Sequence, residues 1–225
     1  MGQAQVPYAV ATNVTTPGII NVDGLTTTGG ITASGAIVAT SGITGSKAFL
    51  SAYTEPANTK AFSIGGRGEA TVASAALVSG TVYAVLTPIE TGLLISNVSL
   101  YAVGAESGGT HAWVGVADNT GKVLGISADN TGAAYFPATT LVTTALAAPF
   151  TTTYTGLYYT FVCVVAGTTV PTFAARTALA NAAIANIAPV YCGTALTGQT
   201  TPVAVGSSLG TITGTAGHAL YTYLT

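Results

Sequence analysis

The chain has very little charge. Of its 225 residues, five are Lys or Arg and seven are Asp or Glu, so only 5% are charged, against about 25% in a typical soluble domain. The net charge of −2 gives no electrostatic reason to bind nucleic acid or an anionic membrane. Disorder combines low hydrophobicity with high net charge, and this sequence shows the reverse. We therefore expect a folded protein with no nucleic-acid and no membrane partner, whose exposed positions are filled by Thr, Ser, Asn and Gly.

Long hydrophobic runs are also missing. A membrane-spanning helix needs about 20 consecutive apolar residues, whereas the apolar run 141–150 is short and interrupted by Thr. The start, Met1-Gly-Gln-Ala-Gln-Val-Pro, has neither the basic residues nor the apolar core of a signal peptide. Without a signal peptide, the protein is expected to be made in the cytoplasm. Because a monomer with so few surface charges tends to self-associate, we expect it to be built into a larger particle.

Residues for covalent or acid–base chemistry are scarce. The two cysteines, Cys163 and Cys192, are too few for a disulfide framework, and we expect them to be buried free thiols. We expect the two histidines, His111 and His218, to be structural. We also expect no hydrolase nucleophile elbow and no phosphate-binding loop in the sequence. The seven scattered acids give no pair of the kind that glycoside cleavage needs. The sequence therefore predicts no enzyme, no catalytic residue and no cofactor.

Apolar residues recur at every sixth position in the N-terminal part, and each follows a Gly or an Ala. A period of six matches neither the α-helix nor the heptad, but it is the period of hexapeptide β-structures. Five hexads are too few for one chain to stack on itself. The pattern predicts an intertwined trimer, or strands laid on a neighbouring protein, and the alternative is a low-complexity linker. The assembly residues are Ile19, Leu25, Ile31, Ile37 and Ile43.

From about residue 47 the sequence shows short runs rich in Val, Tyr and Thr, separated by Gly, Pro and Asn. Strands at intervals of roughly 8–15 residues are typical of an antiparallel sandwich or jelly roll. The segment 176–187 is compatible with either a helix or an irregular loop. The expected fold is all-β, with an anchoring arm over 1–16, a hexad-repeat β shaft or linker over 17–46, and a β-sandwich over 47–225.

Two local patterns have both a structural and a binding interpretation. The tetrapeptide Asp-Asn-Thr-Gly occurs at 118–121 and at 129–132. Its oxygens could hold Ca²⁺, but ordinary turn chemistry is favoured, in which Asp caps its own backbone. We expect the second copy to link a hairpin to a strand near Tyr135 and Phe136.

Tyrosines also cluster around residue 156. Tyr154, Tyr158 and Tyr159, with Phe150, could form a platform for a sugar, although most of them are expected in the core. Strand alternation places Tyr158 on one face, and Tyr159 with Phe161 on the other.

The stretches 111–136, 148–159 and 166–173 together resemble the β-sandwich domains of minor tail, tail-fibre and head-surface proteins of phages that infect actinobacteria. The resemblance covers roughly residues 70–225, and the hexad segment resembles a short fibre shaft. It implies a structural protein, often trimeric and displayed on the virion. It implies no catalytic residue.

The expected function is a trimeric capsid decoration or head-fibre protein of a tailed bacteriophage. Residues 1–46 would bind the major capsid protein or another virion protein by β-addition. The main alternative is a short tail fibre or tail-tip protein that contacts the host surface, where a glycan is the candidate partner. A third interpretation, a polysaccharide-degrading tailspike, is disfavoured by the missing acid pair. Hundreds of copies per particle would indicate the capsid, and a handful the tail.

Overall fold

The computed structural model describes residues 58–63, 70–132, 134–176, 190–215 and 219–225. All of them belong to the compact unit Ser46–Thr225. The described residues do not include the predicted arm (1–16), the predicted shaft (17–46) or most of the segment that is compatible with a helix or a loop (177–187). The five assembly residues lie in the predicted shaft and are therefore also outside the described residues: Ile19, Leu25, Ile31, Ile37 and Ile43. What the sequence predicts for them stays a prediction.

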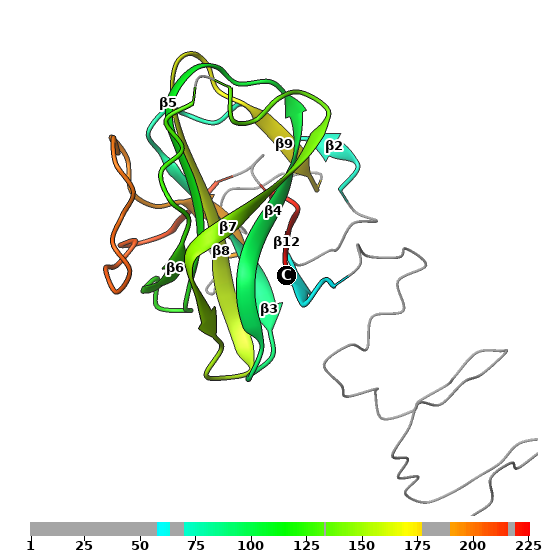
Figure 1. Cartoon of the computed structure of the whole chain (residues 1–225), viewed down its shortest axis with the longest axis vertical. Helices are drawn as coiled ribbons and strands as arrows, with labels where there is room; N and C mark the ends of the chain where they lie inside the picture. The colour runs from blue at the N-terminus through cyan, green and yellow to red at the C-terminus, as the bar shows by residue number, and fades with distance from the viewer. Residues whose placement is uncertain (1–57, 64–69, 133, 177–189, 216–218) are drawn as a thin grey trace, which may run out of the picture. The chain divides into compact units, whose positions relative to one another are not determined.

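Within the described residues, all helix or strand structure is β, as predicted (Figure 1). The strands are β1 Ala61–Phe62, β2 Val72–Ala73, β3 Val82–Ile89, β4 Leu94–Gly104, β5 Ser107–Ala117, β6 Val123–Ile126, β7 Thr140–Thr151, β8 Gly156–Thr169, β9 Thr172–Ala175, β10 Cys192–Thr194, β11 Thr213–Gly214 and β12 Thr222–Leu224.

The strands form two antiparallel sheets. The first sheet has the order β1-β12-β4-β9-β2, and β7 pairs with β4 in addition. The second sheet has the order β11-β10-β3-β8-β5-β6. An isolated bridge between Ser127 and Leu146 joins the β6 side of the second sheet to β7 of the first.

One core fills the space between the two sheets. Because successive side chains of a strand point to opposite faces, alternate residues of each strand enter it, such as Val98 and Leu100 of β4 and Val162 and Val164 of β8. The predicted split of the tyrosines is confirmed, since Tyr158 belongs to this core while its neighbours along β8 face the other way.

The second sheet is buried on its other face as well. There a separate cluster contains Trp113 of β5 and Phe161 and Cys163 of β8. It is covered by the irregular segment 195–212, which we call the cover segment and which appears in orange in Figure 1. Leu209 of the cover segment is 0% exposed. Burial on both faces explains why β3 and the middle of β8 are apolar without alternation.

Backbone hydrogen bonds hold the cover segment in place. The amides of Gly206 and Leu209 donate to the carbonyls of Val123 and Gly121, each at 2.8 Å. At the other side of the sheet, the amide of Val82 donates to the carbonyl of Leu196 at 2.8 Å. The segment is therefore bonded to both β6 and β3, although it has little regular structure.

The link between β6 and β7 differs from the prediction. Tyr135 and Phe136 are not in a strand; the chain bends there, and β7 begins only at Thr140. Phe136 is fully buried, with its ring edge-on to Phe173 at a centroid distance of 4.8 Å. Tyr and Phe have high β-propensity, but here the packing of Phe136 wins, and it closes one end of the core from a bend.

Candidate functional site

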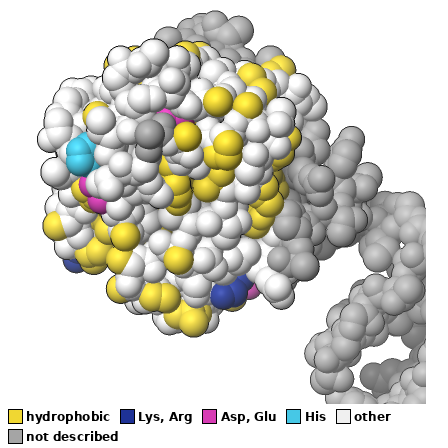
Figure 2. Space-filling view, turned by 45° about the horizontal axis from the view of Figure 1, so that its top comes forward, with side chains coloured by type: hydrophobic (Ala, Val, Ile, Leu, Met, Phe, Trp, Pro, Cys, Tyr) yellow, Lys and Arg dark blue, Asp and Glu magenta, His cyan; other side chains and the backbone are white. Residues whose placement is uncertain are grey.

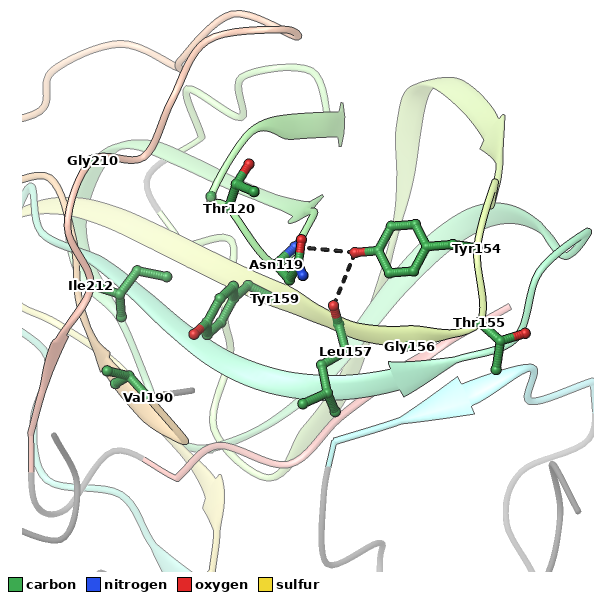
Figure 3. A pocket seen from close by; sticks show the side chains of 11 residues that line it. Asn119, Thr120, Tyr154, Thr155, Gly156, Leu157, Tyr159, Val190, Gly210 and Ile212 are labelled. Atoms are coloured by element: carbon green, nitrogen blue, oxygen red, sulfur yellow. Dashed lines mark hydrogen bonds between the residues drawn. The ribbon is translucent and has the colours of Figure 1, made fainter. Parts of the chain in front are cut away.

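An open cleft of about 590 Å³ lies where the β5–β6 turn, the start of β8 and the cover segment meet (Figure 3). This volume is within the range of about 300–1,000 Å³ that is usual for ligand pockets. Its lining residues are all uncharged, namely Asn119, Thr120, Gly121, Tyr154, Thr155, Gly156, Leu157, Tyr159, Val190, Gly210 and Ile212.

Tyr154 is fixed at one side of the cleft by the hydrogen bonds of its hydroxyl and by the packing of its ring. Its hydroxyl donates to the carbonyl of Leu157 at 3.0 Å and accepts from the amide of Asn119 at 3.1 Å. Its ring stacks on Tyr158, with centroids 4.4 Å apart and planes at 11°. A Cβ on Gly156 would lie 2.8 Å from the Tyr154 ring, so this close packing requires glycine. Tyr154 therefore holds the β5–β6 turn against the start of β8.

Tyr159 differs because its hydroxyl has no partner. The residue is 5% exposed, and within the described part of the chain its hydroxyl makes no hydrogen bond. Figure 3 shows the hydroxyl directed toward Val190 and Ile212 in the wall of the cleft. Burial raises the pKa of Tyr159 above its ordinary value, so the group is a neutral donor and acceptor at physiological pH.

The first Asp-Asn-Thr-Gly copy is the turn that was predicted. Asp118 Oδ1 accepts from the amides of Thr120 and Lys122 at 2.8 and 3.0 Å, and Gly121 has a φ of +83°. Burial acts to raise the pKa of Asp118, but these hydrogen bonds outweigh it and hold the pKa below its usual value. The carboxylate is thus committed to its own backbone.

In the second copy the side chain that caps the backbone is that of Asn130, so the predicted capping by Asp129 is wrong there. Asn130 Oδ1 accepts from the amide of Gly132 at 2.8 Å, while Asp129 Oδ2 lies 2.7 Å from His111 Nδ1. The described residues contain no group of three or more His, Cys, Asp and Glu side chains that could hold a metal ion.

One motif was missed at the level of sequence. Residues 206–210, Gly-Ser-Ser-Leu-Gly, match the Gly-x-Ser-x-Gly pattern, although no nucleophile elbow was expected. Ser208 lies in the irregular cover segment, not in a strand-to-helix turn, and its Oγ accepts from the amide of Gly210 at 3.0 Å. The pattern therefore lacks the backbone context that a nucleophile elbow needs.

Both cysteines are buried free thiols, as predicted. Burial raises the pKa of Cys163 to about 12 and that of Cys192 to about 11. Because the thiolate is the reactive form, neither cysteine is suited to nucleophilic or redox chemistry in this fold.

Glu106 is a buried carboxyl group that we expect to make the stability of the fold depend on pH. It is 4% exposed, and neither carboxylate oxygen makes a hydrogen bond of normal geometry within the described residues. Burial raises its pKa above the ordinary value of 4.5, and the backbone N–H groups of Phe136 and Tyr135 offset only part of the rise. Just above pH 4.5 the folded state therefore holds a proton that the unfolded chain has lost. We therefore expect Glu106 to lower the free energy of unfolding as pH rises through this window.

Urea unfolding of the full chain from pH 4.5 to pH 8 measures this dependence. Glu106→Gln cannot ionise, so its stability should fall less with pH than that of the parent protein. Equal slopes for the two proteins would show that the Glu106 carboxyl titrates normally.

Within the described ranges, the structure has no helix with the length and apolar character needed to cross a membrane. Comparisons with protein-family models, with curated proteins and with solved structures found no match.

Proposed function

We propose that the chain is a structural component of a tailed-phage virion: a trimeric capsid decoration or head-fibre protein that is anchored through residues 1–46. The observation that carries this proposal is a compact β unit whose surface has hardly any charge. Figure 2 shows one face, on which charged side chains form only small separate spots. In the described part of the chain the charged residues are Lys60, Glu90, Glu106, Asp118, Lys122, Asp129 and Arg176.

Such a surface suits a protein that works in an assembly. Isolated proteins stay monomeric and soluble through mixed surface charge, and this chain has little. When many copies are fixed on a particle, part of each surface is covered by neighbours, and the particle itself limits free association. The sandwich-like unit, with its second sheet buried on both faces, supports a role as a rigid projecting head.

The hexad residues support the anchoring half of the proposal. Three copies of the segment would bring the aliphatic rows from Ile19 to Ile43 onto one axis, where burial of apolar surface drives association. Residues 1–16 would then lie along the capsid lattice by strand addition.

A tail-tip or short tail-fibre position is the second candidate, and the uncharged cleft is the observation that favours it. A tail protein meets the host surface, where an open site for a ligand would be useful. The two positions differ in copy number and in location on the particle.

Immunogold labelling tests both positions directly. Antibodies raised against the purified chain should label phage particles produced from the genome that carries the gene. We expect dense labelling over the head, with hundreds of copies per particle by quantitative mass spectrometry. Labelling confined to the tail, at a handful of copies, would replace the capsid assignment with the tail assignment. Particles that contain none of the protein would overturn both.

A further inference from the structure

We propose that the cleft between the β5–β6 turn, the start of β8 and the cover segment binds a neutral carbohydrate. This inference does not depend on the virion assignment, because it rests on the chemistry of the cleft alone.

The charge of the lining selects the class of ligand. All eleven lining residues that the structure describes are uncharged, so none of them compensates the charge of a phosphate, a carboxylate or an amine. The nearest acid in sequence, Asp118, already accepts the amides of Thr120 and Lys122. Taking a charged group out of water without a partner is costly. A neutral ligand is therefore favoured over an ionic one.

The free polar groups of the cleft suit hydroxyl groups. The Tyr159 hydroxyl can both donate and accept, and within the described residues it makes no hydrogen bond, so it is available to a ligand in the cleft. Asn119 is exposed at the rim, and within the described residues its side-chain amide makes no hydrogen bond. Together they offer donors and acceptors at two points of the cleft, the pattern that a polyhydroxyl ligand satisfies.

The apolar groups form the rest of the binding surface. Leu157, Val190 and Ile212 line the cleft together with the rings of Tyr154 and Tyr159. A sugar ring has polar edges and C–H faces, so it can place its faces on these side chains while its hydroxyls reach Tyr159 and Asn119. Pockets that combine an apolar lining with a few placed polar groups are typical of small-molecule sites.

The backbone of the rim argues against an extended peptide as the ligand. A peptide added to a strand needs unpaired backbone groups. Here the amide of Gly121 donates to Asp118, and its carbonyl accepts from Leu209. A peptide strand therefore cannot pair with the backbone of Gly121, and recognition at this part of the rim relies on side chains. The hydrogen bonds of the Tyr154 hydroxyl keep the cleft in one shape before binding, which limits the entropy lost on association.

Binding of the full chain to an immobilised panel of defined oligosaccharides tests the inference. The neutral probes are maltohexaose, laminarihexaose, and galactan- and arabinan-derived hexasaccharides; the charged probes are oligogalacturonate and a heparin-derived hexasaccharide. We expect binding to at least one neutral probe and to neither charged probe, with the affinity then measured by isothermal titration calorimetry.

Two variants show whether the cleft is responsible. Tyr159→Phe removes a single hydroxyl, and Asn119→Ala changes an exposed residue; each should weaken binding at least tenfold with little change in the unfolding midpoint. Tyr101→Phe, which alters an exposed tyrosine of β4 in the first sheet, should bind like the parent protein. The inference is overturned if no neutral probe binds, if a charged probe binds best, or if both cleft variants keep full affinity. If Tyr159→Phe fails to fold, Asn119→Ala decides alone.

Discussion

Replacing Ile31 by Asp is expected to convert a trimer of the full chain into monomers. Ile31 is the middle member of the series Ile19, Leu25, Ile31, Ile37 and Ile43, which are six residues apart. If three chains bring this row to a common axis, the substitution places three carboxylates together in an apolar environment. Burying charges without partners costs several kcal/mol per ion. This cost exceeds the association free energy that the other apolar residues of each row supply near the substitution.

Sedimentation velocity and native mass spectrometry measure the change. The parent protein should have three times the 22.1 kDa mass of one chain, and Ile31→Asp should have the mass of one. Thr28→Asp is the matched control, since it adds the same charge midway between two members of the row, and it should remain trimeric. A parent protein that is monomeric in dilute buffer, or an Ile31→Asp variant that is still trimeric, contradicts the trimer and the anchoring role built on it.

Local sequence signals predicted the parts of the fold that depend on neighbours in the chain. The hairpin of β5 and β6 followed from the turn chemistry of Asp118 and Gly121, which is complete within five residues. The opposite orientation of Tyr158 and Tyr159 followed from the period of two in an extended strand. Both predictions succeeded because tertiary contacts only had to agree with a local preference.

Strand β7 shows where such signals fail. More than half of its residues 140–151 are Thr or Ala, and a proline stands at 149; Ala and Pro are depleted in strands, so the local preference is mixed. The strand forms because β4 offers a ladder to pair with, from Leu94 to Ala102. Pro149 falls within an irregular stretch of that ladder, between the pairs at Ala145 and Phe150, where a missing N–H is tolerated.

The cleft could be predicted only in part, because four separate parts of the chain line it: the β5–β6 turn, the start of β8, Val190 and the cover segment. The sequence drew attention to Tyr154, Tyr158 and Tyr159 and separated Tyr158 from Tyr159 by strand alternation, but it did not show which other residues would line a cleft beside them. Asn119 was interpreted only as part of a turn, and Ile212 had no pattern of its own. These residues meet because the cover segment returns across the second sheet, a long-range contact that no local period encodes.

The cover segment itself leads to the second large effect. Leu209→Ala is expected to lower the free energy of unfolding by about 2–5 kcal/mol, the usual cost of removing a buried leucine side chain. Leu209 is 0% exposed and packs in the cluster with Trp113 and Phe161 on the outer face of the second sheet. Because backbone hydrogen bonds from Leu209 to Gly121 and from Gly206 to Val123 hold the segment in place, it can close only part of the cavity that the substitution leaves.

Val205→Ala is the matched control, because Val205 lies four residues earlier in the same segment but is 57% exposed. Urea unfolding of both variants should show a change within about 0.5 kcal/mol for Val205→Ala, as for other surface substitutions. If the two variants lose the same stability, the cover segment does not bury Leu209 as described. A loss confined to Leu209→Ala would mean that the second sheet depends on this segment to shield a face that strands β3, β5 and β8 make apolar. The wall that the cover segment supplies to the cleft would then be as stable as the fold itself.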